Sequence, residues 1–326
     1  MVAVVAVAGC GSDSSSTDSS GSTGSLEGKK VTLVACGSAN PWCKVFNDRL
    51  VGTLEDKGAS VNVLENDFDA VLAVQQANQA IAQNPDLFIL YASNDTALIG
   101  SVKKAQQAGI PVLYLDSTLD ESILDDGSSQ VVADNTALGR FAGESMIAGL
   151  KEAGVQQGDI AVITGTAGTQ MVEDRQAGFE EAMSKAPQYK TVEVQDGDWD
   201  GVQSGKIAQQ LFAKYGSDGL QGIRTEADYM AVPVIEAAKQ AGITVGSKKG
   251  DLVVVSTNCS KVGVKSMENG QLFATGTEDP PTQADYTADT AIKQLSGETV
   301  PKTVVVPEFK VTRQNLDKHR EVCSQG

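Results

Sequence analysis

Histidine is almost absent from this sequence, because His319 is the only one in 326 residues. A single imidazole near the C-terminus argues against Ser-His-Asp catalysis and against a metal site built from several histidines. Basic residues are also few, with 26 Lys and Arg against 42 Asp and Glu, and the formal net charge is −16. A nucleic-acid-binding protein must neutralise phosphates with clustered Lys and Arg, so this composition argues against nucleic acid as a partner.

The apolar stretch at the start of the chain, residues 2–9, is too short to span a bilayer. It runs into Val7-Ala8-Gly9-Cys10, which resembles the lipobox of bacterial lipoproteins, where the chain is cut before the cysteine and the cysteine carries lipid. The resemblance implies that Cys10 is lipidated and that acyl chains anchor the protein. No Lys or Arg precedes the apolar stretch, so we expect the natural start to lie upstream of Met1 or to have been set late. The alternative is an apolar N-terminus followed by a cysteine by chance.

The segment after Cys10 is rich in small polar residues. Residues 11–28 contain eight Ser, two Thr and four Gly. Such a composition cannot bury apolar surface and is typical of a flexible tether. We therefore expect residues 1–28 to be the remnant of a lipoprotein signal and a tether, with the folded body starting near Lys29, outside the cytoplasm and anchored to the cell membrane.

Metal-binding CxxC spacing is missing as well, although four cysteines follow the tether: Cys36, Cys43, Cys259 and Cys323. An even number of cysteines in an exported chain permits two disulfides, and four cysteines allow three pairings. A catalytic thiol at Cys43 would have His319 as its only imidazole partner, which disfavours nucleophilic catalysis.

From residue 31 onward, short runs rich in β-branched residues alternate with amphipathic helical patterns. The predicted strands are 31–36, 61–65, 86–91, 111–116, 129–134, 159–165, 191–195, 220–225, 251–257 and 271–276. The predicted helices are 43–58, 70–83, 96–108, 135–153, 169–186, 200–215, 228–241 and 261–269. Apolar strands that alternate with helices indicate parallel sheets covered by helices on both faces. The pattern runs through two halves of similar length with no Gly- or Pro-rich linker between them.

Two late segments, a predicted helix at 281–296 and a strand run at 304–312, follow after both sheets would be complete. Their position indicates that the chain crosses back between two lobes. Several crossings form a hinge, and the cleft between the carboxyl ends of the strands is where open α/β sheets bind ligands.

Several short motifs occur in a recognisable order along the chain. They are Ala39-Asn40-Pro41-Trp42, Ala108-Gly109-Ile110-Pro111-Val112 leading to Asp116, Ala133-Asp134-Asn135, Gly165-Thr166-Ala167-Gly168-Thr169, Arg175-Gln176-Ala177-Gly178-Phe179, Gly197-Asp198-Trp199-Asp200, Glu226-Ala227-Asp228-Tyr229 and Asn269-Gly270-Gln271-Leu272. In this order, over about residues 31–312, the chain resembles the type I periplasmic substrate-binding proteins of sugar ABC transporters, particularly the ribose-binding type.

The resemblance implies two Rossmann-like α/β lobes, each a parallel sheet with helices on both faces, joined by a hinge of three crossings. It places the N-terminal lobe at 29–133 plus 279–308 and the C-terminal lobe at 134–278 plus 309–326. The crossings match Asp134, Glu278 and Glu308. With these boundaries, pairing Cys36 with Cys43 and Cys259 with Cys323 keeps each disulfide inside one lobe, and we expect that pairing.

The same resemblance implies a sugar site in the cleft. Trp42 and Trp199, the only tryptophans, match two aromatic platforms, one from each lobe, that would stack on the apolar faces of a sugar ring. Polar positions around the ring match Asn40, Asp116, Arg175 and Asn258, and a guanidinium can hold two adjacent hydroxyls. The remaining candidates are Cys43, where the family usually has another aromatic residue, with Asp134, Asp228 and Glu278, some of which would serve the hinge.

Each assignment has a structural alternative. The tryptophans could be ordinary core residues, Asp116 could cap a helix, and Arg175 could form a surface ion pair with Glu173 or Asp174.

Four positions depart from the family pattern: Ser117 replaces an Arg, Ala227 an Asn, Asn258 an Asp and Glu278 a Gln. The cleft should therefore be more acidic than a ribose site and could accept a polyol, an amino sugar or another cationic small molecule.

Two other motifs lack the residues of the sites they suggest. Gly165–Gln170 is glycine-rich but has no GK[ST], so it is not a phosphate-binding P-loop. Asp196–Asp200 is acidic but lacks the spacing of an EF-hand calcium loop. We expect no cofactor and no metal.

The leading hypothesis is a monomeric, lipid-anchored binding protein that captures a sugar or polyol and delivers it to an ABC transporter permease. A sensor that presents the same ligand to a chemoreceptor or kinase is a second hypothesis. A third is a hydrolase using paired carboxylates such as Asp116 and Asp134. A transcriptional regulator is excluded because no helix-turn-helix segment is found.

Overall fold

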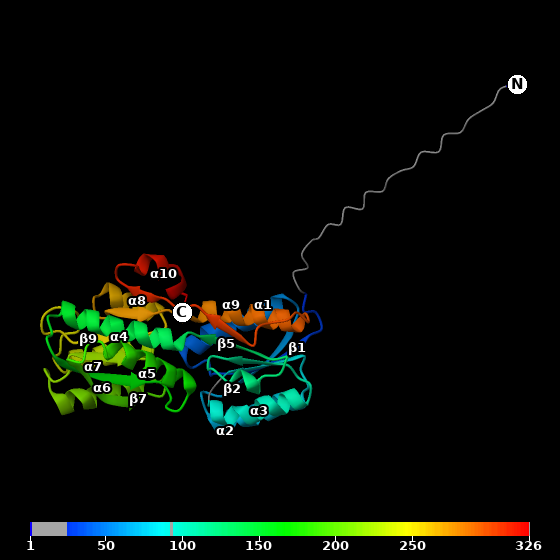
Figure 1. Ribbon diagram of the computed structural model, residues 1–326, viewed down its shortest axis with the longest axis horizontal. Helices are drawn as coiled ribbons and strands as arrows, with labels where there is room; N and C mark the ends of the chain where they lie inside the picture. Colours follow the sequence, from blue (N-terminus) through cyan, green and yellow to red (C-terminus); the bar gives the residue numbers. More distant parts are fainter. Residues whose placement is uncertain (2–24, 92–93, 326) are drawn as a thin grey trace.

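The structure is a computed structural model that describes Met1, residues 25–91 and residues 94–325. The predicted lipidation site Cys10 lies outside the described residues. The described chain forms two α/β lobes side by side, each built on a six-stranded sheet (Figure 1). This is the fold class that the alternating pattern predicted.

The N-terminal lobe has an entirely parallel sheet in the strand order β11-β5-β4-β3-β1-β2. Its strands are β1 (Lys30–Ala35), β2 (Ser60–Glu65), β3 (Leu87–Tyr91), β4 (Val112–Leu115), β5 (Ser129–Ala133) and β11 (Thr303–Val306). Its helices are α1 (Pro41–Asp56), α2 (Ala70–Ala82), α3 (Asp95–Gln107) and α9 (Pro280–Leu295), with a 3-10 turn η1 (Glu121–Ile123). Helices α1 and α9 cover one face and α2 and α3 the other, so all five residues of β3 are buried.

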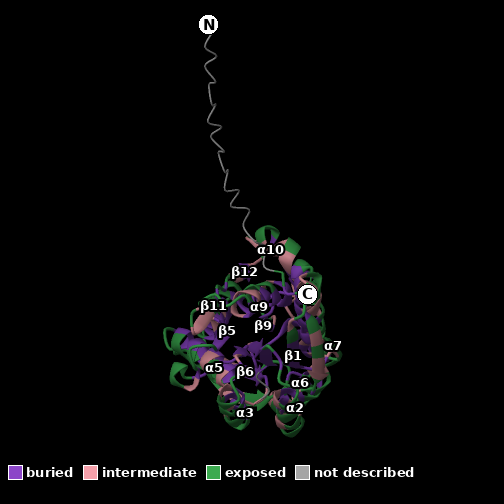
Figure 2. Cartoon of the chain, turned by 90° about the vertical axis from the view of Figure 1, so that its right-hand side faces the viewer, coloured by how far each residue is buried: buried purple, intermediate pink, exposed green. Residues whose placement is uncertain are grey.

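The C-terminal lobe repeats this plan with the strand order β12-β10-β9-β8-β6-β7. Its strands are β6 (Gly158–Thr164), β7 (Tyr189–Asp196), β8 (Gly222–Thr225), β9 (Val253–Val255), β10 (Ala274–Gly276) and β12 (Lys310–Thr312). Its helices are α4 (Asn135–Glu152), α5 (Gln170–Met183), α6 (Gly201–Tyr215), α7 (Asp228–Gln240), α8 (Lys261–Glu268) and α10 (Leu316–Cys323). Helices α4 and α5 pack on one face, and α6, α7 and α8 on the other. The buried residues lie mainly in the strands of the sheets, while the outer faces of the helices are exposed (Figure 2).

The chain passes between the two sheets three times, between β5 and α4, between β10 and α9, and between β11 and β12. Side chains at the first two crossings also start the following helices. Asp134 accepts a hydrogen bond from the Ala137 N–H at 2.9 Å, and Asp279 accepts one from the Thr282 N–H at 2.8 Å. Each cap satisfies a backbone donor that the first helical turn leaves open, so the helix starts where the lobe changes.

Two details of the predicted sheets were wrong. The run 304–312 is not one strand: β11 ends at Val306, and β12 begins at Lys310 in the other sheet. Pro307 between them has no N–H to continue a ladder. Strand β12 also pairs antiparallel with β10, so the C-terminal sheet is not wholly parallel. Sequence reasoning did not predict α10, a short helix that buries only Leu316 and Cys323.

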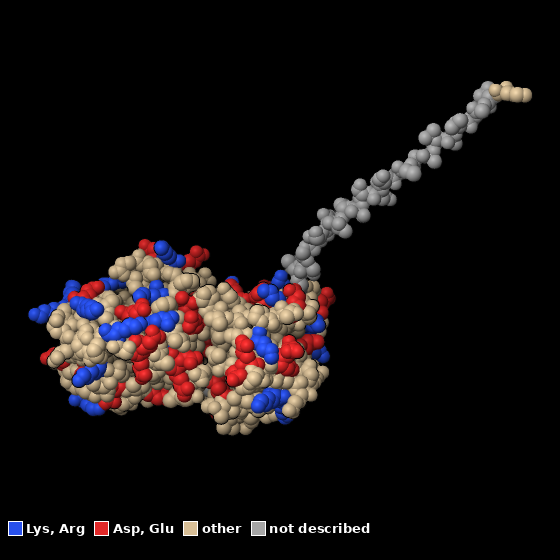
Figure 3. Space-filling view, in the orientation of Figure 1, with Lys and Arg blue, Asp and Glu red and all other residues tan. Residues whose placement is uncertain are grey.

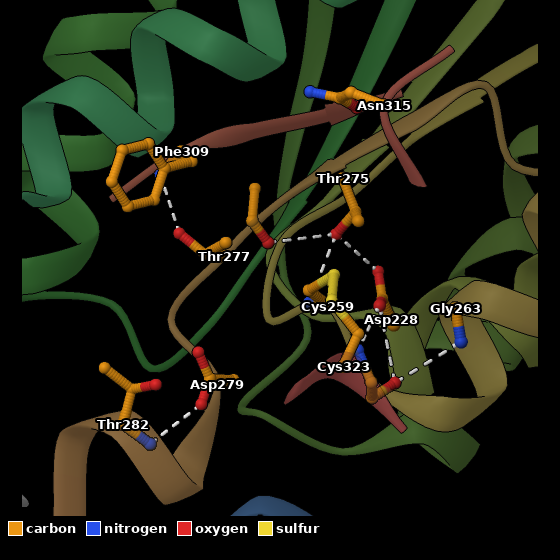
Figure 4. The surroundings of a disulfide bond; sticks show 12 residues. Asp228, Cys259, Gly263, Thr275, Thr277, Asp279, Thr282, Phe309, Asn315 and Cys323 are labelled. Atoms are coloured by element: carbon orange, nitrogen blue, oxygen red, sulfur yellow. Dashed lines mark hydrogen bonds between the residues drawn. A yellow bond between two sulfur atoms is a disulfide. The ribbon is translucent and has the colours of Figure 1, made fainter. Parts of the chain in front are cut away.

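Two disulfides join the cysteines in the expected pairing, Cys36 with Cys43 and Cys259 with Cys323. The second bond ties α10 to the loop after β9, beside the buried carboxylate of Asp228 (Figure 4). Each disulfide lies within one lobe, so neither restrains the movement of the lobes relative to each other.

Acidic and basic side chains are interspersed over the face of the molecule seen in Figure 3, with no uniformly basic area there. Among the described residues, no helix is both long and apolar enough to cross a membrane.

Candidate ligand-binding site

A small cavity lies between the lobes, at the carboxyl ends of strands from both sheets. Its volume is about 20 Å³, close to what one ordered water needs. The lining residues are Asn40, Trp42, Cys43, Phe68, Tyr91, Asp116, Met171, Arg175, Trp199, Tyr229, Asn258 and Glu278. All the ligand residues expected from the sequence except Asp134 and Asp228 are in this set.

The two exceptions lie away from the cavity, where they complete local structure. Asp134 caps α4 at the first crossing, as described above. Asp228 begins α7, but its carboxylate points away from the cleft and accepts hydrogen bonds from the Ser260 N–H at 2.8 Å and the Thr275 hydroxyl at 2.9 Å. It is fully buried, and burial raises its pKa to about 7. The structure therefore does not bring these two predicted residues to the site.

Sequence reasoning missed Phe68, Tyr91, Met171 and Tyr229 in the cavity wall. Tyr91 is the last residue of β3, Phe68 follows β2, and Met171 and Tyr229 are each the second residue of a helix. All four occupy the carboxyl edge of a sheet, where α/β proteins bind ligands. Scanning this edge for aromatic side chains in every βα connection would have found three of them.

The two tryptophans come from different lobes, and each is only 8 % exposed. Trp42 stacks on Phe46 with ring centroids 5.1 Å apart, and its indole N–H donates to the Glu278 carbonyl at 2.9 Å. Trp199 lies against Gly165 and faces the Arg175 guanidinium, whose central carbon is 5.4 Å from the ring centroid. Both rings are therefore held by packing while they border the cavity.

Arg175 is the centre of a buried charge network. Its guanidinium donates to Glu278, to the Asn135 side chain at 2.8 Å and to the Glu226 carbonyl at 3.3 Å. The Glu226 carboxylate lies 3.6 Å from Arg175 and 2.6 Å from Arg224. The alternative of a surface pair with Glu173 or Asp174 was wrong, because the Arg175 side chain is fully buried.

Burial dominates the titration of the cavity groups. It raises the pKa of Asp116 and the pKa of Glu278 above their ordinary values, although the Arg175 charge opposes both increases. Burial by itself lowers the pKa of Arg175, but Glu278, Glu226 and Asp116 together raise it. Arg175 thus stays charged, whereas Asp116 and Glu278 are ready to bind a proton or a hydrogen-bond donor.

Three buried oxygens in the cavity wall have no hydrogen-bond partner within the described chain: Asp116 Oδ1, Asn258 Oδ1 and Glu278 Oε2. The other oxygen of Asp116 accepts from the Tyr91 hydroxyl, and the other oxygen of Glu278 accepts from Arg175. Buried acceptors are almost always satisfied in native proteins. A ligand hydroxyl or amine in this cavity would supply the hydrogen-bond donors that these three oxygens lack.

The same residues have unusual backbone conformations. Asp116, Asn258 and Glu278 have φ values of 73°, 83° and 70°, and Phe68 and Trp199 have φ values of 64° and 53°. A left-handed backbone is unfavourable for such side chains, and its occurrence at several positions around one cavity is typical of a functional site.

The first turn of α1 is fixed by two local features. The Asn40 side-chain oxygen caps the helix by accepting from the Trp42 N–H at 2.9 Å, and the Cys36–Cys43 disulfide ties that turn to the end of β1. Cys43 therefore lines the cavity as a disulfide sulfur and not as a free thiol.

Direct contacts hold the lobes together on both sides of the cavity. The Asn40 side-chain amide donates to the Tyr229 hydroxyl at 2.9 Å, and the backbone N–H of Gln170 donates to Asp95 at 2.8 Å. Asp95 also accepts from the hydroxyl of Ser117, the residue that stands where an Arg was expected. The small cavity and these contacts describe a closed arrangement of the lobes.

A larger open groove of about 540 Å³ adjoins the cavity and shares Asn40, Phe68, Trp199 and Tyr229 with it. Its outer wall includes Asp67, Asp198 and Asp200.

Comparison with known proteins agrees with this geometry. The family described as "Periplasmic binding protein domain" matches residues 31–299. The chain is 29 % identical to the D-allose-binding periplasmic protein of Escherichia coli K12 over 304 residues, 89 % of this chain and 92 % of that protein. It is 27 % identical to the D-ribose/D-allose-binding protein of Pseudomonas aeruginosa, over 73 % of this chain and 72 % of that protein. Its fold matches the Caulobacter myo-inositol binding protein with a TM-score of 0.81 and 19 % identity, covering 90 % of this chain and 96 % of the other.

Proposed function

Because the chain belongs to the family of periplasmic binding proteins, we propose that it captures a sugar or polyol between its lobes, outside the cytoplasm, and delivers it to an ABC transporter permease. The observation that carries the proposal is the interlobe cavity, in which indole rings from both lobes meet three unpartnered buried acceptors. The relatives named above are binding proteins, and this chain is likewise a binding protein and not an enzyme.

A sugar suits this combination of groups. The ring of a sugar has apolar C–H faces that pack on aromatic side chains, and its hydroxyls donate as well as accept. Trp42 and Trp199 would contact the faces, while Asp116, Asn258 and Glu278 would accept from the hydroxyls. Arg175 would offset part of the negative charge of the site, and its ion pair would hold Glu278 in place.

Ligand binding would work by shifting an equilibrium between open and closed lobes. The three crossings are the only covalent connections between the described lobes, so rotation about them opens the cleft. A ligand that contacts both walls stabilises the closed form, whose surface is what a permease would recognise.

Anchoring by lipid at Cys10 is part of the proposal. The small residues before Cys10 and the Ser- and Gly-rich stretch after it support a lipoprotein whose body is tethered at the membrane. That the body acts as a monomer is part of the same proposal. The test is expression of the chain with its native upstream sequence, as wild type and as Cys10→Ser. Wild type should incorporate labelled palmitate and sediment with membranes, and the variant should do neither. Equal sedimentation of both would contradict the lipid anchor.

Thermal unfolding of the full chain tests the binding function. The panel is pentoses, hexoses, polyols and amino sugars. A compound that binds only the folded state, at 100 times its dissociation constant, adds about 2.7 kcal/mol, which should raise Tm by about 5 °C. Trp199→Ala is the matched variant, and a response that it loses assigns the binding to the cavity. No change in Tm with any compound of the panel would contradict the proposal. Conversion of a bound sugar to product would indicate a hydrolase.

Delivery requires a second measurement. The purified chain and its ligand should stimulate ATP hydrolysis by an ABC permease complex from the same organism, reconstituted in liposomes. Stimulation of a chemoreceptor or kinase in place of a permease would assign the sensor role.

A further inference from the structure

Three buried acceptor oxygens in the cavity wall have no hydrogen-bond donor within the described chain. They belong to Asp116, Asn258 and Glu278, which are at most 5 % exposed. The Tyr91 hydroxyl donates to the other Asp116 oxygen, and each guanidinium nitrogen of Arg175 already donates to a protein acceptor.

The buried charges around the cavity are also unbalanced. Three carboxylates, those of Asp116, Glu226 and Glu278, face two guanidinium groups, those of Arg175 and Arg224. Glu226 lies between both arginines and Glu278 pairs with Arg175, which leaves Asp116 with Tyr91 as its only direct partner. With all five groups ionised this set carries one net negative charge, and the nearby carboxylates of Asp95 and Glu308 add to it. Burial raises the pKa of Asp116 and of Glu278.

The groove that leads to the cavity has the same sign. Asp67, Asp198 and Asp200 belong to its wall, and no Lys or Arg is among the described residues that line it. A cleft lined by one sign of charge concentrates ligands of the opposite sign. The aromatic rings are compatible with this, because the faces of indole and phenol rings attract cations as well as sugar C–H groups.

We propose that the ligand is a hydroxylated cation, a sugar or polyol that carries a protonated amine. The inference rests on the proposed binding function and narrows its ligand class. The ammonium group lies between the free oxygens of Asp116 and Glu278 and donates to both, while a hydroxyl donates to Asn258. The amine supplies the positive charge that the network lacks, and a neutral sugar does not.

Titration calorimetry on the full-length wild-type chain tests the inference. The probes are D-glucosamine, D-galactosamine and D-mannosamine, each against its parent hexose and its N-acetyl derivative, at about pH 6, where the amines are protonated. The expected result is that at least one amine binds ten times or more tighter than both uncharged partners. A neutral hexose that binds as tightly as its amine overturns the inference and leaves the proposed function intact. Binding of none of these compounds overturns the inference, and the proposed function then depends on the neutral polyols and pentoses of the thermal screen.

Removing the charge of Glu278 tests whether this carboxylate causes the preference for an amine. Glu278→Gln keeps the shape of the side chain and removes its negative charge, so the preference for the amine over the parent hexose should fall at least fivefold. Glu298→Gln is the matched control, because Glu298 is exposed and lies outside the cavity. An unchanged preference in Glu278→Gln contradicts the assigned contact.

The pH dependence of wild type is an independent readout that does not depend on a variant folding. The charged and titratable groups that face Asp116 and Glu278 are Arg175, Asp95, Tyr91, Tyr114, Tyr229 and Glu308. Because burial raises the pKa of both carboxyl groups, affinity for an amine should rise with pH as they ionise, as long as the amine stays protonated, whereas affinity for a neutral hexose should not rise. Equal pH profiles for amine and hexose contradict the proposal.

Discussion

Gly165 leaves room for the Trp199 ring, and the substitution Gly165→Ala should weaken ligand binding strongly. Gly165 directly follows β6, and its backbone lies against the indole. A Cβ added at this position would lie within 2.6 Å of the ring atom Cδ2 and closer still to Cε2 and Cζ2. The nearest atoms all belong to the side chain of Trp199, so the ring must move and the backbone of the cavity wall need not.

The size of the effect follows from the geometry. An ordinary contact between carbon atoms is about 3.5 Å, so the ring must shift by about 1 Å or more. The ring borders a cavity of only 20 Å³ and has the Arg175 guanidinium near its face. A displaced ring therefore occupies space that the ligand needs. We expect affinity to fall about 100-fold or more, about 2.7 kcal/mol, and folding stability to fall by about 1–3 kcal/mol from overpacking.

Titration calorimetry with a ligand from the thermal screen measures the first effect, and thermal unfolding measures the second. Gly100→Ala is the matched control, because Gly100 is an exposed residue of α3 with open space at its Cβ. That variant should bind normally and gain about 0.5–1 kcal/mol of stability. In a Trp199→Ala background, Gly165→Ala should cost almost nothing further. Wild-type affinity in Gly165→Ala, or full additivity of the two substitutions, would refute the reasoning.

Other substitutions test the remaining features of the site and its supports. Trp42→Ala should weaken binding by about 1–3 kcal/mol through lost ring contact, and unchanged affinity in calorimetry would remove Trp42 from the site. Tyr229→Phe removes the hydroxyl that accepts from Asn40 across the lobes, so ligand affinity should fall about fivefold. X-ray scattering of the ligand-free variant should show a more open chain than wild type, and an identical scattering curve would contradict this. Burial raises the pKa of Asp228 to about 7, whereas an Asp in an unfolded chain has a pKa of about 3.9. The folded state therefore binds a proton more tightly than the unfolded state. The resulting stabilisation is present at low pH and is lost as the pH rises from about 4 to about 7. Asp228→Asn should therefore lose less Tm than wild type over that range, and parallel curves would count against it. Cys323→Ser opens a disulfide with a sequence separation of 64 and should lower folding stability by about 4 kcal/mol, because the bond restricts a long loop in the unfolded chain. Cys43→Ser opens one with a separation of 7 and should lower stability by only about 2.5 kcal/mol. A lower Tm for Cys43→Ser than for Cys323→Ser would rule out this explanation.

Strand and helix positions were predictable because they depend on nearby residues. The β3 segment is a short apolar run that can be stable only when both of its faces are covered, and the structure buries all of it. Asn40 was expected as a polar residue of the site from the resemblance, and it does line the cavity, but its capping of α1 through the Trp42 N–H was not predicted. The resemblance placed a lobe crossing at Glu308, but the β-rich run 304–312 was read as one strand, and composition alone does not show that it is two strands broken at Pro307.

The roles of individual carboxylates were less predictable. Asp116, Asp134 and Asp228 each follow a strand, and all three were candidate ligand residues, with Asp134 also matched to a lobe crossing. In the structure Asp116 borders the cavity, Asp134 caps a helix, and Asp228 is buried behind the wall with Ser260 and Thr275. The difference depends on the direction in which each side chain leaves the sheet edge and on partners that are distant in sequence.

The sequence by itself determined the alternation of strands and helices, the two halves, the even set of cysteines and the presence of one tryptophan in each half. These features follow from periodicity, capping and composition, which act over a few residues. Only the tertiary structure decided that Arg175 pairs with Glu278, 103 residues away, and that Asn40 contacts Tyr229, 189 residues away. Such contacts depend on how two sheets approach each other across the hinge, and that approach is set by packing of the whole chain. The sequence already indicated an acidic cleft, but the pairing that joins Glu278 to Arg175 and leaves Asp116 with Tyr91 is a property of the closed lobes.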